Sequence, residues 1–195
     1  MAVKDPILKR FRYLGISPMA IGIDKKSNRN PGGNTRKKVS EYGTQLKEKQ
    51  KVKFIYGVGE RQFRGYYEEA ERMRGKTGDN MLSMLERRLD NVVFRLGLAQ
   101  SRNACRQIVS HRQITVNGKS VNIRSYLVKV GDVIAVKENK QKKEMFADVK
   151  SLRVIVPKWL EFDADKLVGK VVALPKREDI DIDIQEHLII ELYSK

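Results

Sequence analysis

Four arginines near the middle of the chain have the type and placement best suited to a chemical task. They are Arg88, Arg95, Arg102 and Arg106. The segments that carry them are predicted to form two consecutive helices that converge on a hairpin. A guanidinium offers a planar fork of donors that can grip two phosphate oxygens at once. We therefore expect these side chains to face one way and to bind the phosphate backbone of a folded nucleic acid.

The overall charge favours the same kind of partner. Lys and Arg number 40 against 24 Asp and Glu, a formal net charge of +16, and nucleic acid is the natural counter-ion of such a chain. The excess lies in residues 1–150, which hold 33 basic and 15 acidic side chains, whereas residues 151–195 hold 7 and 9. A membrane surface would also attract this charge, but the sequence has no apolar run of about 18 residues and no marked basic amphipathic helix.

Signatures of catalysis are missing from the sequence. It contains no phosphate-binding loop, zinc-protease motif or hydrolase motif. His111 and His187 have no neighbouring Cys or His to complete a metal site. Cys105 is predicted to be a small buried side chain on the inward stripe of a helix. We expect no enzyme, no catalytic residue, no metal, no cofactor and no small-molecule substrate.

The single cysteine and the chain's start predict a cytoplasmic protein. Cys105 cannot form an intramolecular disulfide, and the first ten residues lack the apolar core of a secretory signal. Residues 2–38 are rich in Gly, Asn, Pro and Lys, which fits either a disordered basic tail or an arm that RNA orders.

Apolar periodicity predicts the helices of the first half of the chain. Residues 41–74 are predicted to be helical with a break at Gly57 and Gly59. Asp79 is predicted to cap a long helix that ends at Gly97. The apolar face expected after the first break consists of Phe63, Tyr66, Tyr67, Ala70 and Met73.

A shorter helix and a small sheet are predicted next. Ser101 is expected to cap the helix, with Arg102, Arg106 and Arg112 outside and Ala104, Cys105, Ile108 and Val109 inside. After it the apolar residues alternate, and Asn117-Gly118 between them is a strong hairpin signal because both positions need positive φ. A third strand is expected at Val133–Val136. The acidic residues at 178–183 precede a last helix, whose dipole favours negative charge there.

Several stretches of the sequence resemble the ribosomal protein S4 family. Arg88-Leu-Asp-Asn-Val-Val, the stretch Ser101–His111 and Thr115-Val-Asn-Gly resemble the small RNA-binding domain named after that family. The same domain occurs in pseudouridine synthases, RNA methyltransferases, a heat-shock protein and tyrosyl-tRNA synthetases. The flanks SEYGTQLKEKQK, IYGV, ERQFR and EHLIIELYSK look like ribosomal S4 itself. The resemblance covers nearly the whole chain.

The resemblance implies an α+β fold. We expect a mainly helical domain with an inserted, alpha-L-like RNA-binding domain of two helices packed on a short antiparallel sheet. The expected parts are a basic extended arm at 1–40, a helical domain at 41–86 completed by the C-terminal helix 180–195, and an insert at 87–179. The core of the insert is expected at 87–150, followed by a C-terminal extension.

The resemblance also implies a function within the small ribosomal subunit of the cytoplasm. The family's role is to bind the 5′ domain of the ribosomal RNA at a multi-helix junction and so to nucleate assembly. It borders the channel through which messenger RNA enters, where Arg36-Lys37-Lys38 matches basic residues thought to help unwind the messenger. It contacts ribosomal protein S5 at an interface linked to translational accuracy, and we also expect ribosomal protein S3 as a partner.

Two other functions are weighed against this one. An RNA-modifying enzyme can use the same domain as an RNA-binding guide module, but it needs a catalytic domain of about 150 residues or more besides. A DNA-binding helix-turn-helix is weakened because a hairpin follows the second helix directly.

Three departures from the family pattern are visible. Many relatives carry four N-terminal cysteines that bind zinc, whereas residues 11–30 hold none, so we expect a zinc-free arm. The usual Pro-Gly-x-His-Gly reads Pro31-Gly-Gly-Asn-Thr35, and Arg124 stands where a proline is common.

The expected RNA contacts lie on the basic faces and in the matching motifs. They are Arg36, Lys37, Lys38, Lys47, Lys49, Lys51, Arg61, Arg64, Arg88, Arg95, Ser101, Arg102, Arg106, Gln107, His111, Arg112, Asn117 and Lys119.

Overall fold

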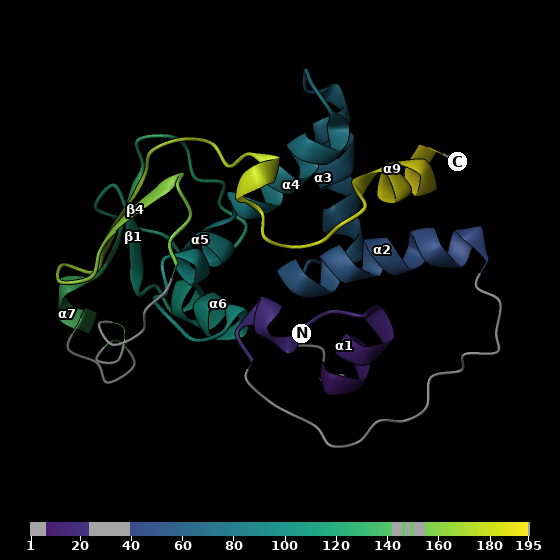
Figure 1. Ribbon diagram of the computed structural model, residues 1–195. Helices are drawn as coiled ribbons and strands as arrows, with labels where there is room; N and C mark the ends of the chain where they lie inside the picture. The colour runs from purple at the N-terminus through teal and green to yellow at the C-terminus, as the bar shows by residue number, and fades with distance from the viewer. Residues whose placement is uncertain (1–6, 24–39, 142–145, 147–148, 150–154, 195) are drawn as a thin grey trace. The chain divides into compact units, whose positions relative to one another are not determined.

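The chain forms two compact units in a computed structural model (Figure 1), which describes residues 7–23, 40–141, 146, 149 and 155–194. Unit 1 comprises Met1–Gly78 and Ile182–Lys195, and unit 2 comprises Asp79–Asp181. Unit 2 is therefore inserted into unit 1 in sequence.

Unit 1 is helical in the residues described. Its elements are α1 (Ile7–Leu14), the short η1 (Pro18–Ile21), α2 (Glu41–Tyr56), α3 (Glu60–Arg72) and α9 (Glu186–Ser194). The predicted break between α2 and α3 is confirmed, since Gly57 ends α2 with φ 51° and Gly59 caps α3. The outward position of Met73, which is 44% exposed, shows that its predicted inward orientation is wrong.

The expectation of an extended arm is wrong for residues 7–23. Phe11 and Leu14 are buried, and they lie three residues apart on one face of α1. Phe11 meets Phe54 of α2 edge to face, with ring centroids 5.1 Å apart. Apolar residues at helical spacing, rather than the basic ones around them, decide the conformation here.

Glu60 at the start of α3 connects α2, α3 and α9. Its carboxylate accepts hydrogen bonds from Lys49 Nζ at 2.8 Å, from Tyr193 Oη at 2.9 Å and from Lys53 Nζ. Desolvation by burial acts to raise the pKa of Glu60, but these hydrogen bonds outweigh it and lower the pKa to about 2.

This depressed pKa predicts a loss of stability in acid. The ionised Glu60 stabilises the fold at neutral pH, and that contribution disappears as the pH falls from the unfolded value near 4.5 toward the folded value near 2. We expect the drop in unfolding free energy between pH 7 and pH 3 to be smaller in Glu60→Gln than in the wild type. Urea titrations at the two pH values measure it. Glu69→Gln, an exposed change on the same helix, should match the wild type, and equal drops in all three proteins would contradict the assignment.

Unit 2 combines helices with one sheet, and the predicted α+β class is confirmed. Its first helix, α4 (Thr77–Glu86), starts at the end of unit 1's first segment and is followed by α5 (Leu89–Arg95), α6 (Arg102–Ser110), α7 (Glu138–Gln141) and η3 (Arg177–Asp179). The antiparallel sheet has the order β2-β1-β3-β5-β4. Its strands are β1 (Ile114–Val116), β2 (Lys119–Ser120), β3 (Val133–Val136), β4 (Leu160–Asp163) and β5 (Val168–Val171).

The predicted hairpin and third strand are confirmed. Asn117 and Gly118 have φ values of 51° and 77° and join β1 to β2, with Val116 paired to Lys119. Strand β3 has the predicted bounds. The sequence interpretation missed β4 and β5, which extend the sheet beyond β3.

The predicted long helix from Asp79 is wrong in two respects. It begins earlier, at Thr77, and it is interrupted at residues 87–88. There the chain pairs with residues 124–128, through a bridge between Arg88 and Leu127 and a hydrogen bond from Val128 N to the Arg87 carbonyl at 3.0 Å. This long-range pairing replaces the local helical hydrogen bonds.

The core of unit 2 lies between the sheet and helices α5 and α6. Val92, Leu96 and Cys105 are fully buried against the inward side chains of β1 and β3. Burial raises the pKa of the Cys105 thiol to about 12, so it is a packing residue with little thiolate at neutral pH. The inward positions predicted for Cys105, Ile108 and Val109 are confirmed.

Gly169 on β5 is required by the close approach of Leu96. A Cβ atom at this position would lie 2.5 Å from Leu96 Cδ1 and 2.7 Å from Cδ2. We expect Gly169→Ala to lower the free energy of unfolding by about 1–3 kcal/mol, because a packed core must move to admit the methyl group. Gly65→Ala on α3, where nothing lies within 4 Å of the added atom, is the control. Urea unfolding that shows no difference between the variants would contradict this packing.

Candidate nucleic-acid interface

The four arginines singled out by the sequence are largely buried. Arg88 and Arg102 are each 4% exposed, and the side chains of Arg95 and Arg106 are 10% and 17% exposed. The expectation of an outward array, and of Arg102 and Arg106 on the outer face of their helix, is therefore wrong. The physical reason is the set of buried acidic and amide side chains beside them, which offers each guanidinium a partner inside the unit.

Asp90 at the start of α5 holds two of these arginines. Arg88 binds it with both arms of its fork, Nε to Oδ1 at 3.1 Å and Nη2 to Oδ2 at 2.9 Å. Arg106 of α6 donates its Nε to the same Oδ2 at 3.1 Å. The carboxylate thus links the break before α5 to the middle of α6.

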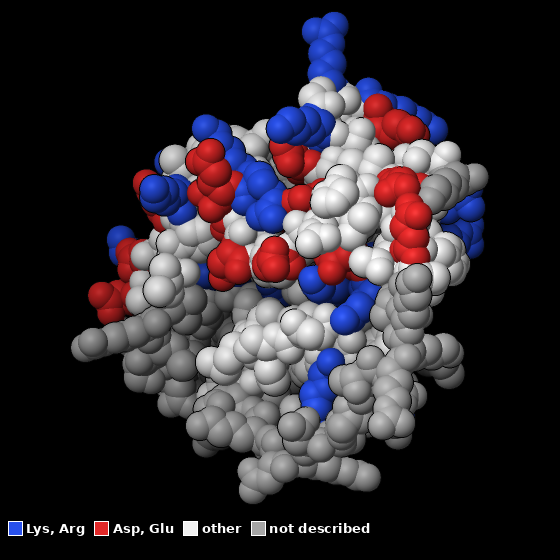
Figure 2. Space-filling view, turned by 45° about the vertical axis from the view of Figure 1, so that its right-hand side comes forward, with Lys and Arg blue, Asp and Glu red and all other residues white. Residues whose placement is uncertain are grey.

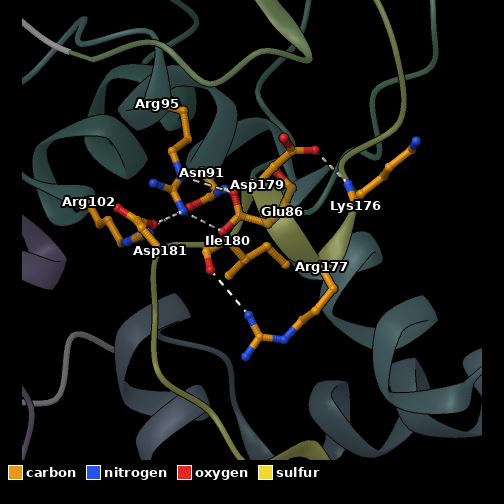
Figure 3. Close-up of polar contacts among 9 residues, drawn as sticks. All are labelled: Glu86, Asn91, Arg95, Arg102, Lys176, Arg177, Asp179, Ile180 and Asp181. Atoms are coloured by element: carbon orange, nitrogen blue, oxygen red, sulfur yellow. Dashed lines mark hydrogen bonds and ion pairs between the residues drawn. The ribbon is translucent and has the colours of Figure 1, made fainter.

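A second polar network surrounds Glu86 (Figure 3). Arg95 donates to its two carboxylate oxygens at 3.0 Å and also pairs with Asp181 at 2.8 Å. Desolvation acts to lower the pKa of Arg95, but Glu86 and Asp181 together raise it. Desolvation likewise acts to raise the pKa of Asp181, and Arg95 outweighs it and lowers the pKa. Arg95 therefore stays charged, and it ties α4 and α5 to the segment that follows η3.

Asn91 connects this network to α6. Its Nδ2 donates to Glu86 Oε2 at 2.8 Å, and its Oδ1 accepts from Arg102 Nη1 at 2.8 Å. The guanidinium of Arg102 also lies 4.4 Å above the ring of Phe94, within range of a cation–π contact. Together with the predicted Ser101 cap, which is confirmed by a hydrogen bond from Ala104 N to Oγ at 3.3 Å, these contacts fix the start of α6.

Among the residues of unit 2 that the sequence predicted as RNA contacts, the exposed ones lie at the end of α6 and on the hairpin. Gln107, His111, Arg112 and Lys119 are all exposed, and Arg112 takes a positive φ of 54° where the chain leaves the helix. Asn117 is exposed too, but its amide is engaged in hydrogen bonds within the unit. It donates to Asp132 Oδ1 at 2.8 Å and accepts from Val133 N at 2.9 Å. These outward donors are therefore separate from the side chains of the buried networks.

Arg124 is an exposed cation that the sequence did not predict as an RNA contact. Its carbonyl accepts from Asp90 N at 3.2 Å, which brings it next to the buried network. The one sequence signal was its unusual residue type within the resemblance.

Of the basic residues expected to bind RNA in unit 1, some form ion pairs within the unit and others are exposed. Lys49 pairs with Glu60 at 2.8 Å and Lys51 with Glu48 at 2.7 Å, so both take part in ion pairs within the unit. Arg61 and Arg64 on α3 are exposed, with Arg64 paired to Glu68 at 3.0 Å. Lys47 is half-buried, and Arg36, Lys37 and Lys38 lie outside the described residues.

Charges of both signs are interleaved on the face drawn in Figure 2, where Asp and Glu lie among Lys and Arg. Within the described ranges no group of three His, Cys, Asp or Glu side chains could hold a metal ion. A helix long and apolar enough to cross a membrane is likewise missing from the part of the chain that the structure describes.

Two family models match the chain in succession. Residues 5–86 match the Ribosomal protein S4/S9 N-terminal domain, and residues 87–134 match the S4 domain. Small ribosomal subunit protein uS4 of Agathobacter rectalis is 57% identical over the full length of both chains. The chain belongs to the ribosomal protein S4 family. The uS4 proteins of Caldicellulosiruptor saccharolyticus and Clostridioides difficile are 64% and 58% identical, over 84% and 87% of this chain and 79% and 84% of theirs.

Membership of the S4 family confirms the predicted resemblance. The alternative of a guide module in an RNA-modifying enzyme loses its support, because a ribosomal protein matches the chain from end to end. The matched S4 domain contains α5, α6, β1 and β2. It therefore holds most of the buried networks and the exposed residues from Gln107 to Lys119.

Proposed function

We propose that this chain is a structural constituent of the small ribosomal subunit and binds ribosomal RNA through its S4 domain. The observation that carries the proposal is the contrast within that domain. Buried arginines tie α5 and α6 to each other and to Glu86 at the end of α4, whereas Gln107, His111 and Arg112 at the end of α6 and Lys119 on the hairpin are exposed.

A rigid set of outward donors suits the chemistry of structured RNA. The deep groove of A-form RNA is closed to side chains, so proteins recognise phosphates, 2′-hydroxyl groups and the shape of junctions. Fixed cations also lower the repulsion between closely packed RNA helices without reading bases. We propose as the binding site the 5′ domain of the ribosomal RNA at a multi-helix junction, where the protein nucleates assembly.

The finer partners belong to the same proposal. Family membership supports a place beside the channel through which messenger RNA enters and contacts with ribosomal proteins S5 and S3, with a contribution to translational accuracy. In unit 1, Arg61 and Arg64 of α3 are exposed cations that we assign to contacts with these partners.

A competition experiment tests the RNA-binding function. The full chain is bound to a labelled 5′-domain RNA fragment and challenged with unlabelled fragment or duplex DNA in a gel shift. We expect the fragment to compete far better than the DNA, and equal competition would contradict the proposal.

Substituting two exposed cations makes this experiment site-specific. We expect the double variant Arg112→Gln and Lys119→Gln to bind the fragment more weakly and to lower the slope of log affinity against log salt by about 2, because each substitution leaves one phosphate without its cation. Lys166→Gln and Lys170→Gln, two exposed lysines near and on β5, form the matched control. If both double variants weaken binding equally, the end of α6 and the hairpin are not the contact surface.

A further inference from the structure

Two arginines bind one carboxylate beside α6, and the backbone of a third arginine lies against the same residue. Arg88 and Arg106 both bind Asp90, at 2.9 Å and 3.1 Å. Arg124 is held next to the same residue, because Asp90 N donates to its carbonyl at 3.2 Å. The charges of both Arg88 and Arg124 act on Arg106, so positive charge gathers beside this carboxylate.

The backbone that carries Arg124 is fixed rather than free to move away. Leu89 N donates to the Tyr126 carbonyl at 2.8 Å, and the bridge between Arg88 and Leu127 continues the pairing. The side chain of Arg124 is exposed, and that of Arg106 reaches the surface with 17% of its area. The two cations are therefore presented to the solvent from a rigid base.

The neighbouring positive charges act against the charge on Arg106. Desolvation by burial is the largest influence lowering the pKa of Arg106, and the charges of Arg88 and Arg124 lower it further against the opposing effect of Asp90. An anion bound between Arg106 and Arg124 would relieve that repulsion. It would also gain charge-assisted hydrogen bonds from two guanidiniums.

We propose that Arg106 and Arg124 together bind one phosphate group of the RNA backbone, with Arg88 and Asp90 holding them in place. This rests on the proposed RNA-binding function and adds Arg124 as a contact. A phosphodiester of a long RNA fits better than a small free anion. The exposed Gln107, His111 and Arg112 continue along the chain from Arg106, so that neighbouring phosphates and sugars would find donors as well.

The test uses Arg124→Gln in the full chain. The backbone carbonyl that accepts from Asp90 is kept, so the melting temperature should stay at the wild-type value. We expect affinity for the 5′-domain RNA fragment to fall on the order of tenfold, the usual worth of a hydrogen bond to a charged group. The slope of log affinity against log salt should fall by about 0.7–0.9, the value for one phosphate. Lys170→Gln, which removes an exposed lysine from the face of the sheet turned away from α5 and α6, should change neither quantity.

A second arm separates this site from the RNA-binding function as a whole. Thermal melts in inorganic phosphate, with equal ionic strength of chloride as reference, should show stabilisation of the wild type and less stabilisation of Arg124→Gln. Wild-type slope and affinity in Arg124→Gln would overturn the site. A wild type without preference for the RNA fragment would overturn the proposed function, and the site would then stand or fall on whether the variant loses the stabilisation by phosphate.

Discussion

Replacing Asp90 by alanine is expected to lower the free energy of unfolding by about 3–5 kcal/mol, the usual effect of removing one partner of a buried ion pair. Asp90 is 4% exposed and accepts three hydrogen bonds from Arg88 and Arg106. Without it, two largely covered guanidiniums lack the carboxylate between them and repel each other. Because small proteins are stable by only about 5–15 kcal/mol, urea unfolding followed by circular dichroism should show a large shift.

Asp181→Ala is the control for this prediction. Asp181 also pairs with a partly buried arginine, Arg95, but its own side chain is 73% exposed, so its removal should cost at most about 1 kcal/mol. Asp90→Asn, which keeps an acceptor and removes the charge, should fall between the two. An Asp90→Ala variant no less stable than Asp181→Ala would show that the network around α5 and α6 does not support the unit.

Binding to ribosomal RNA is expected to weaken steeply with salt. If the protein neutralises about 6 to 10 phosphates, its affinity should fall on the order of a thousandfold or more between 50 and 200 mM salt, because each neutralised phosphate releases counter-ions. Fluorescence anisotropy with a labelled 5′-domain fragment at a series of salt concentrations measures the slope. A response that is nearly flat would mean that the net charge of +16 takes no part in recognition.

The elements that the sequence predicted correctly are those decided by neighbouring residues. Ser101 caps α6 through a hydrogen bond that spans three residues. Asn117 and Gly118 accept positive φ more readily than other residues, which fixes the turn between β1 and β2. Gly57 ends α2 with a positive φ for the same local reason, and Gly59 caps α3 with extended backbone. In each case the signal and its structural effect lie within a few residues of each other.

The errors come from contacts between distant parts of the chain. The interruption of the helix at residues 87–88 depends on pairing with residues 124–128, which helical periodicity cannot reveal. Strand β4 did carry a local signal, since Leu160 and Phe162 alternate with Glu161 and Asp163. The place of β5 beside β3, and of β4 beside β5, depends on long-range pairing that the sequence does not state.

The candidate site shows most clearly the difference between what local signals predict and what packing decides. Sequence identified the right helices and the right excess of charge, but it assumed that arginines lie at the surface. Burial of Arg88 depends on Asp90 two positions away, and burial of Arg102 depends on Asn91 and Phe94 of the preceding helix. Once these acceptors and rings are in place, the arginines stabilise the domain from within and, apart from Arg106, leave the role of contacting RNA to other, exposed side chains.

Crosslinking followed by mass spectrometry tests the central claim most directly, which is that the outward residues of α6 and the hairpin meet the RNA. The full chain bound to the 5′-domain fragment is irradiated, and the crosslinked peptides are identified. We predict crosslinks in residues 106–112, at Lys119 and at Arg124. Crosslinks confined to β4, β5 and the outer face of the sheet, with none in α6 or the hairpin, would contradict the account.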